Sequence, residues 1–271
     1  MSKRGQDRGE LKAGETGMRS TNVSVCMATH NGERFIKEQM ESILRELGEE
    51  DEVVVSDDGS TDRTVLLVKD FDDRRIRLFE GNSFRSAVLN FEFSLRQCLG
   101  RFIFLSDQDD IWCPGKVAAM TNLLSMHDLV QSDACIIDES STVLVPSVFR
   151  AGHCGAGLLK NLCHNSYYGN SMAFRRRLLD WSLPFPANVA MHDWWIGLVC
   201  ELLGKPCFHD RVLTRWRRHA HNTTPVGGRS NTPLLRRLRW RVELMANLSR
   251  RFWRAKSAGR SMACKADVAG I

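Results

Sequence analysis

The first half of the chain alternates short apolar segments with segments whose apolar residues recur at helical spacing. The apolar segments are typical of buried strands and cover residues 23–29, which are rich in β-branched residues, and residues 53–56, 76–80 and 101–107. The helical segments cover residues 34–47, 63–71 and about 88–99. Strands joined through helices run parallel, and strands that are apolar throughout have both faces covered. The alternation therefore predicts an α/β fold with a mostly parallel sheet flanked by helices.

The rest of the chain is predicted in less detail. Helices are expected at about 116–125 and at 192–204, and strands at 134–138 and 211–219. The stretch 140–190 is rich in Gly, Asn and Cys and has no readable periodicity. We expect a disordered N-terminal extension over 1–20, one folded domain over 21–228 and a basic tail over 229–271.

Positive charge is concentrated at the C-terminal end. The 271 residues carry a net charge of +6, but segment 229–271 alone holds eleven Lys and Arg against Glu243 and Asp267. That segment is therefore at +9, which leaves 1–228 at −3. A folded body of this charge is not a nucleic-acid-binding surface.

The cysteines and the N-terminal residues indicate the compartment. None of the nine cysteines forms a CxxC pair, which favours reduced core thiols over metal sites or disulfides. Residues 1–20 contain no apolar leader, and no run of eighteen apolar residues occurs in the chain. We therefore expect a cytoplasmic protein.

Two acidic clusters follow predicted strands, namely Asp57–Asp58 and the group Asp107, Asp109 and Asp110. Ligands of open parallel sheets bind beyond the carboxyl ends of the strands. An Asp-x-Asp spacing directs Asp107 and Asp109 to one side of an extended segment, where Mg²⁺ or Mn²⁺ would link them to phosphates. Because no glycine-rich phosphate loop is present, a metal is the expected phosphate-binding agent. Solvated turns with helix caps are the alternative for both clusters.

Four ordered segments resemble glycosyltransferase family 2: VSVCMATHNGERFIKEQMESIL, DEVVVSDDGSTDRT, FIFLSDQDDIWCPGK and MHDWWIGLVCELLGK. The resemblance spans about residues 22–222 and is strongest to the rhamnosyltransferase-like subgroup. It implies a GT-A (Rossmann-like) fold, with a nucleotide-sugar half at about 21–115 and an acceptor half at about 116–228. It also implies an inverting transferase with a nucleotide-diphosphate sugar donor of the dTDP or UDP type.

The resemblance also implies roles for the residues at the donor side. Thr29 and Asn31 would lie near the base or ribose, and Asp57 and Asp58 would contact the base and the ribose. Asp107 and Asp109 match the family's DxD motif, in which the second Asp holds the cation on the diphosphate. Asp107 would then assist the metal or contact the ribose.

The segment TRWRRHAHNTT stands where relatives carry a Tyr-Arg-Gln-His-like sequence. Trp216 and Arg218 replace the Tyr and Gln, whereas Arg217 and His219 match. His219 is a candidate contact of the metal or the diphosphate, and a core or surface histidine is the alternative.

On the acceptor side, the resemblance implies that Asp193 is the general base. It would deprotonate the acceptor hydroxyl, and its place at a helix start would keep the carboxylate ionised. A plain helix cap is the alternative. We expect His192, Trp194, Trp195 and Asp110 to support this site, although the two tryptophans are equally compatible with core packing.

Segment 233–256 is predicted to form a basic amphipathic helix. Its apolar residues along one face are Leu235, Leu238, Val242, Met245 and Phe252. Such a helix suits peripheral contact with an anionic membrane, here the inner face. Packing on the folded domain is the alternative.

The expected function is transfer of a single sugar, with rhamnose as one candidate, to a glycan or lipid-linked acceptor in surface polysaccharide synthesis. The enzyme would be of the hexosyltransferase type, metal-dependent and single-displacement. The QxxRW motif of processive synthases is absent. A nucleotidyltransferase and a non-catalytic sugar-nucleotide-binding relative are the alternatives. The sequence THNGERF lacks the basic, glycine-rich loop that a nucleotidyltransferase would need.

Overall fold

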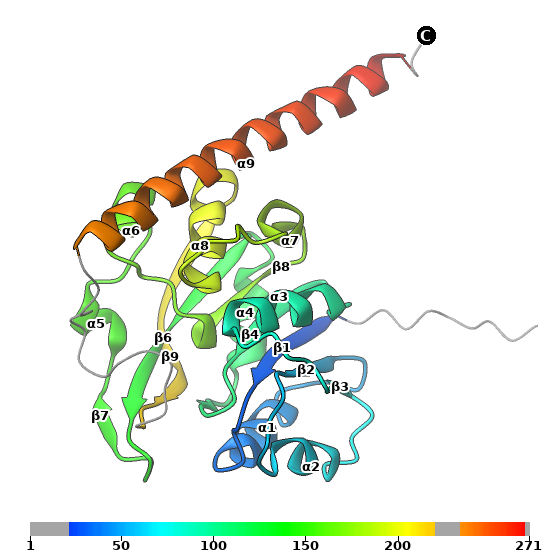
Figure 1. Ribbon diagram of the computed structural model, residues 1–271, viewed down its shortest axis with the longest axis vertical. Coiled ribbons are helices and arrows are strands. Elements are labelled where there is room, and N and C mark those ends of the chain that lie inside the picture. Colours follow the sequence, from blue (N-terminus) through cyan, green and yellow to red (C-terminus); the bar gives the residue numbers. More distant parts are fainter. Residues whose placement is uncertain (1–21, 220–233, 269–271) are drawn as a thin grey trace, which may run out of the picture.

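The computed structural model describes residues 22–219 and 234–268. Within these residues, nine strands form one sheet with helices on both faces (Figure 1). The strands lie in the order β3-β2-β1-β4-β8-β6-β9-β5, and β7 pairs with β6 beside this path. The predicted extension 1–20 and the end of the predicted domain at 220–228 lie outside the described residues.

The first half of the sheet is parallel. Its strands are β1 (Val23–Thr29), β2 (Glu52–Asp57), β3 (Ile76–Phe79) and β4 (Phe102–Ser106). Helices connect them in sequence: α1 (Ile36–Leu44), α2 (Thr64–Lys69) and α3 (Ala87–Gln97). Strand β1 pairs in parallel with β2 and β4, and β2 pairs in parallel with β3. The predicted alternation is confirmed, including the order of all seven elements.

The second half adds strands of both directions. Its strands are β5 (Ile111–Trp112), β6 (Leu129–Ile137), β7 (Val143–Val145), β8 (Met172–Arg175) and β9 (Pro206–Arg217). Its helices are α4 (Lys116–Leu123), α5 (Val148–Gly152), α6 (Leu158–Cys163), the 3₁₀ helix η1 (Gly169–Ser171), α7 (Arg177–Ser182) and α8 (His192–Leu203). Strand β8 runs antiparallel between β4 and β6 and joins the two halves into one sheet. Both β6 and β9 begin five residues earlier than the predicted strands 134–138 and 211–219.

Each face of the sheet buries its own core. Val25 and Met27 point to the face covered by α1, α2 and α4. Cys26, between them, points to the opposite face, which α3, α6, α7 and α8 cover. Successive side chains of a strand alternate between faces, so a strand covered on both sides must be apolar throughout. This explains why these strands read as continuous apolar runs.

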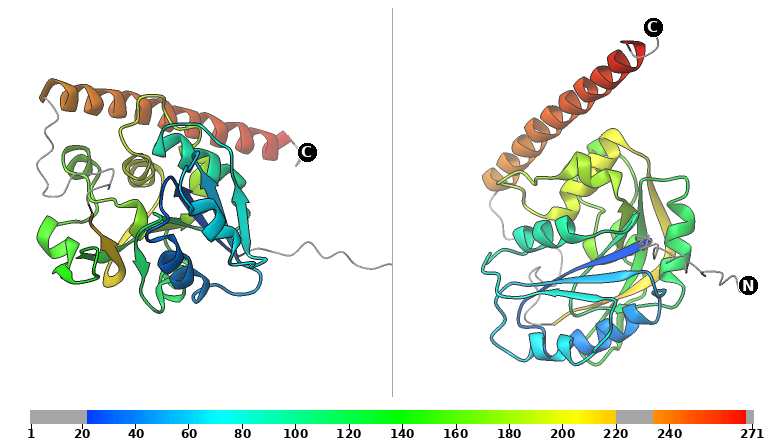
Figure 2. Two further views of the ribbon diagram at one scale, coloured as in Figure 1. Left: turned by 60° about the horizontal axis from the view of Figure 1, so that its bottom comes forward. Right: turned by 90° about the vertical axis from the view of Figure 1, so that its right-hand side faces the viewer.

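Helix α9 (Leu234–Val268) lies along the outside of the domain, and its C-terminal part extends past the rest of the molecule (Figures 1 and 2). It packs on α6 and α8 through Leu244 and Leu248, which are buried. The predicted helix is present, and Val242 and Met245 of its predicted apolar face are exposed. No helix in the described ranges combines the length and apolar character needed to cross a bilayer.

Candidate active site

The predicted site residues gather at one edge of the sheet. Strand β1 has β2 on one side and β4 on the other, so the direction in which strands are added reverses there. Thr29 ends β1, Asp57 ends β2, and Asp107 directly follows β4. Because these strands are parallel, all three residues lie at the same carboxyl edge, where open α/β sheets bind ligands.

Asp57 is a buried anchor of this edge. Its carboxylate accepts hydrogen bonds from Thr29 Oγ1 (2.8 Å) and from both Ser60 Oγ (2.6 Å) and Ser60 N (2.8 Å). Asn31 is exposed, has φ of 50°, and its N–H donates to Ser60 Oγ at 2.8 Å. Thr29 and Asp57 are each only 1% exposed, so they shape the site from beneath. Asn31, in contrast, is exposed at the surface of the site.

Asp58 remains partly exposed and orders the segment between β3 and α3. Its two carboxylate oxygens accept from the N–H groups of Phe84 (2.5 Å) and Ser86 (3.1 Å). Its carbonyl oxygen lies 2.9 Å from His30 Nδ1. Asp58 thereby links the ends of β1 and β2 to the start of α3, and it is better placed than Asp57 to face a nucleotide.

Gln108 ties the acidic segment to the end of β1, a role that the sequence interpretation missed. Its side chain exchanges two hydrogen bonds with the main chain of His30: His30 N donates to Oε1 (2.9 Å), and Nε2 donates to His30 O (3.0 Å). A Cβ on Gly32 would lie 2.4 Å from Gln108 Oε1, so a larger residue there would displace this amide from its two hydrogen bonds. The signal was present, because the residue between two acids of an extended Asp-x-Asp points to the opposite side.

Asp107, Asp109 and Asp193 come close together although they are far apart in sequence. Asp107 keeps some accessible surface, but burial, followed by the charges of Asp109 and Asp193, raises its pKa to about 7. The Arg218 guanidinium and Lys116 oppose this shift. His219 Nε2 lies 2.7 Å from Asp109 Oδ2. The structure therefore brings the predicted metal residues Asp107 and Asp109 close to the predicted base Asp193. The positive charge of Arg218 acts at the same place.

Asp110 is fully buried and supports the site from below. Arg217 N donates to its Oδ1 and Asn170 Nδ2 to its Oδ2, both at 2.8 Å. The buried Arg217 side chain also donates to Asp109 O at 3.0 Å. These bonds fix the end of β9 and so place His219 beside Asp109. Burial, with the charges of the neighbouring acids, holds the pKa of Asp110 well above its ordinary value.

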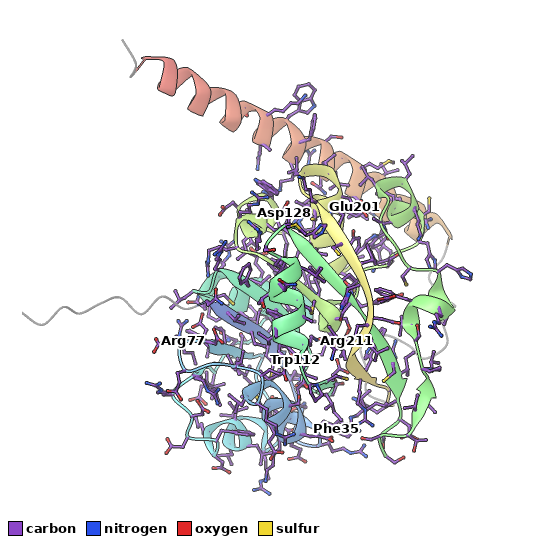
Figure 3. The ribbon with its side chains drawn as sticks, turned by 180° about the vertical axis from the view of Figure 1, so that it is seen from behind. Phe35, Arg77, Trp112, Asp128, Glu201 and Arg211 are labelled. Atoms are coloured by element: carbon purple, nitrogen blue, oxygen red, sulfur yellow. The ribbon has the colours of Figure 1, made fainter. Side chains whose placement is uncertain are left out.

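Lys116 is a second buried support that the sequence interpretation did not find. Its Nζ donates to Asn170 O (2.8 Å) and Thr214 Oγ1 (2.7 Å), and lies 4.4 Å from the Trp112 ring centroid. Burial lowers the pKa of Lys116 to about 7. Trp112 lies beside α4 (Figure 3) and is 3% exposed, so it packs in the core. The sequence offers no signal for Lys116, which reads as an ordinary first residue of a helix.

Asp193 occupies the second position of α8 and is 8% exposed. Its carboxylate accepts from Gly169 N (3.0 Å) and Trp194 N (2.6 Å). Burial raises its pKa to about 6, against the opposing effect of these hydrogen bonds. The helix cap position belongs to Met191, so Asp193 is not the cap. A carboxyl that ionises near neutral pH is suited to act as a general base.

His192 and the tryptophans of α8 support the helix from inside the protein. The His192 ring stacks on Phe91 with centroids 3.9 Å apart, and neither ring nitrogen has a hydrogen-bond partner within the described residues. Burial lowers the pKa of His192 to about 3, so the ring is neutral. Trp195 is fully buried and donates to a main-chain carbonyl at 2.9 Å. Trp194 is partly buried and donates to another at 2.7 Å. Trp195 is therefore a core residue.

The sheet order and the acidic carboxyl edge define an α/β fold of the GT-A glycosyltransferase class. One similar solved structure is that of residues 1–349 of S. aureus TarS in complex with UDP-GlcNAc. Its TM-score is 0.60 at 18% identity, covering 84% of this chain and 72% of that one. Another is the mannosyltransferase PcManGT from Pyrobaculum calidifontis in complex with GDP-Man and Mn²⁺. Its TM-score is 0.56 at 16% identity, covering 93% of this chain and 81% of that one.

The sequence profile of Glycosyl transferase family 2 matches residues 24–181, and the chain belongs to that family. An Escherichia coli relative, UDP-Glc:alpha-D-GlcNAc-diphosphoundecaprenol beta-1,3-glucosyltransferase WfgD, is 31% identical over 107 residues. That match covers 40% of this chain and 42% of the relative. An uncharacterised glycosyltransferase of Haemophilus influenzae is 24% identical over 221 residues, 75% of this chain and 68% of the relative. The chain thus spans less than half of the first relative. The predicted rhamnosyltransferase-like subgroup stays a prediction.

Proposed function

We propose that the protein is an inverting glycosyltransferase that transfers one sugar from a nucleotide-diphosphate sugar to a glycan or lipid-linked acceptor. One observation carries the proposal. Asp193 is a buried carboxyl whose pKa burial raises to about 6. It lies near Asp107 at the strand edge, and its charge contributes to the raised pKa of Asp107. Membership of the family supports a transferase. The name of the E. coli relative specifies a diphosphoundecaprenol-linked acceptor, which supports a lipid-linked acceptor and a role in surface polysaccharide synthesis.

The proposal includes a divalent cation, Mg²⁺ or Mn²⁺. No three His, Cys, Asp or Glu side chains in the described residues are grouped so as to hold a metal by themselves. Mg²⁺ sites of nucleotide enzymes, however, need only one or two carboxylates, because phosphate and water supply the other ligands. Asp109 with Asp107 fits that donor set, and a cation would offset the repulsion that raises the pKa of Asp107. When bound, it would neutralise charge on the departing diphosphate.

The residues around the cation site have separate roles in this proposal. His219 hydrogen-bonds Asp109 and orients that carboxylate, as outer partners of metal ligands do. Asp58 and Asn31 would contact the base and ribose, which is supported by their exposure at the nucleotide side. Arg218, whose charge acts on Asp107 and Asp109, brings a positive group to the place expected for the diphosphate.

Asp193 performs the proton transfer in a single displacement. The acceptor hydroxyl oxygen attacks the anomeric carbon, and its proton passes to the Asp193 carboxylate. The bond between the anomeric carbon and the diphosphate oxygen breaks, and the nucleotide diphosphate leaves with that electron pair. The hydrogen bond from Gly169 N holds the carboxylate in place.

The proposal is tested with a panel of donors. The protein is incubated with dTDP-rhamnose, UDP-glucose, UDP-GlcNAc and GDP-mannose, with Mn²⁺ or Mg²⁺, and release of the nucleotide diphosphate is followed. We expect metal-dependent release with at least one donor. The exposed Asp180 on α7 provides a matched control, because Asp180→Asn should release nucleotide at the wild-type rate. No release with any donor, together with pyrophosphate formation from a nucleoside triphosphate, would overturn the proposal in favour of a nucleotidyltransferase.

A further inference from the structure

The outward side of α9 carries apolar and basic side chains together. Val242 is 60% exposed, Met245 is 48% exposed and Trp253 is 67% exposed. At about 100° per residue, the exposed Lys256 lies on the same side of the helix as these three residues, and the exposed Arg250 and Arg254 lie along one edge of that side. We call this surface the outer face of α9; its residues are Val242, Met245, Arg250, Trp253, Arg254 and Lys256.

The opposite side of α9 is already used for packing. Leu244 and Leu248 are 4% and 5% exposed, and they lie in the core with α6 and α8. Arg241 Nε donates to Leu162 O at 3.1 Å, and Arg251 donates to Leu183 O at 2.8 Å. These contacts recur at helical spacing and hold the helix against the domain. The apolar residues of the outer face are therefore not part of the packing that attaches the helix.

The charge around the outer face is strongly positive. Segment 234–268 contains ten Lys and Arg, against only Glu243 and Asp267. Glu243 pairs with Arg239 at 2.8 Å, so its charge is balanced within the helix. None of the six residues of the outer face is acidic, and Glu243, which lies between Arg250 and Arg254 at its edge, is the one already paired with Arg239. Its electrostatic complement is an extended anionic surface.

We propose that the outer face of α9 docks on an anionic lipid bilayer and holds the enzyme at the membrane surface. This inference goes beyond the proposed activity, and its residues take no part in the chemistry. The combination matches a helix lying in the plane of the interface, with apolar side chains below the headgroups and basic ones among them. Trp253 is suited to the headgroup level, because its ring is apolar and its N–H is polar.

Vesicle co-sedimentation of the full chain tests the inference. Vesicles of equal parts phosphatidylcholine and phosphatidylglycerol are compared with vesicles of phosphatidylcholine alone. We expect binding to the anionic vesicles only. The basic residues are removed together in Arg250→Gln/Arg254→Gln/Lys256→Gln. Each basic residue near such a surface is worth about fivefold in affinity, so the triple variant should bind about 100-fold more weakly.

Matched controls separate this surface from the overall charge. The variant Arg45→Gln/Lys69→Gln/Arg74→Gln removes the same charge from exposed side chains of the first half and should bind within about twofold of wild type. Trp253→Ser should bind about tenfold more weakly, whereas Leu66→Ser, at a similarly exposed position of 57%, should not. Donor-dependent nucleotide release without vesicles should be unchanged in every variant.

Three results would overturn the inference. The first is equal binding of wild type to neutral and anionic vesicles. The second is an equal loss in both triple variants. The third is a Trp253→Ser variant that keeps its vesicle binding but sediments as a smaller species in analytical ultracentrifugation. That last result would assign the outer face to contact between copies of the chain. Because nucleotide release is measured separately, failure of the membrane inference is distinguishable from failure of the proposed activity.

Discussion

Asp193→Asn separates a chemical role of Asp193 from a structural one. Burial raises the pKa of this carboxyl from 3.8 to about 6. Between these values the folded chain holds a proton that the unfolded chain has lost. The free energy of unfolding of the wild type therefore falls as pH rises from about 4 to about 6, and the loss persists at higher pH. Asparagine is neutral at every pH and has nearly the same shape, so the variant does not carry this cost.

The magnitude follows from the shift in pKa. About 2 pKa units correspond to about 3 kcal/mol. We expect the free energy of unfolding of Asp193→Asn, relative to that of wild type, to be about 3 kcal/mol larger at pH 8 than at pH 4, so the variant gains relative stability as pH rises. A constant offset from weakened hydrogen bonds with Gly169 and Trp194 cancels in that comparison. Turnover should fall by about 10²- to 10⁴-fold, as expected for loss of a general base.

Urea denaturation, followed by circular dichroism between pH 4 and pH 8, measures the free energy of unfolding of the variant and of wild type. Asp180→Asn, which changes an exposed carboxyl, should show no comparable dependence on pH. Titration calorimetry measures the affinity for the donor, and the affinity of Asp193→Asn should remain close to that of wild type. A stability difference that does not change with pH would refute the burial argument. Normal turnover of Asp193→Asn would refute the assignment of the base.

Further substitutions test the other parts of the site and of the fold. Asp109→Asn should abolish the Mn²⁺ dependence of donor binding, and calorimetry with and without metal would show whether that dependence survives. Gln108→Ala should raise the donor KM by about tenfold, because two hydrogen bonds that join the loops are lost; an unchanged KM would contradict this. Leu248→Ala should lower the free energy of unfolding by about 2–5 kcal/mol, whereas Met245→Ala on the outer face should change it by less than about 0.5 kcal/mol. Equal effects in thermal denaturation would count against the packing of α9.

The predictable part of the fold is the part where local pattern and global topology agree. Strands β1, β2 and β4 are buried on both faces, so each reads as a largely apolar run, and the polar residues that end them lie at the ligand edge. Stretch 140–190 was unreadable because its helices α5, α6 and α7 are only five or six residues long. Elements of that length contain too few turns to show a period.

The site was predictable only as far as its acidic residues. Asn170 and Gly169 act through one amide and one main-chain N–H, and both come from the 3₁₀ helix η1 inside the unreadable stretch. Lys116 is recognisable only once α4 is known to lie over Trp112. In α9, the sequence did not single out Leu244 and Leu248, the two leucines that pack on the domain. Arg241 and Arg251 point inward to carbonyl groups, so the buried side of this helix is not its most apolar one.

The central claim is a single displacement at the anomeric carbon with Asp193 as the base. Its most direct test uses whichever donor the panel identifies, with the acceptor or water, and determines the anomeric configuration of the first product by proton NMR. We predict that the configuration is inverted relative to the donor in the wild type, and that no product accumulates with Asp193→Asn on the same time scale. A product with retained configuration, or one formed equally fast without the Asp193 carboxylate, would contradict the account.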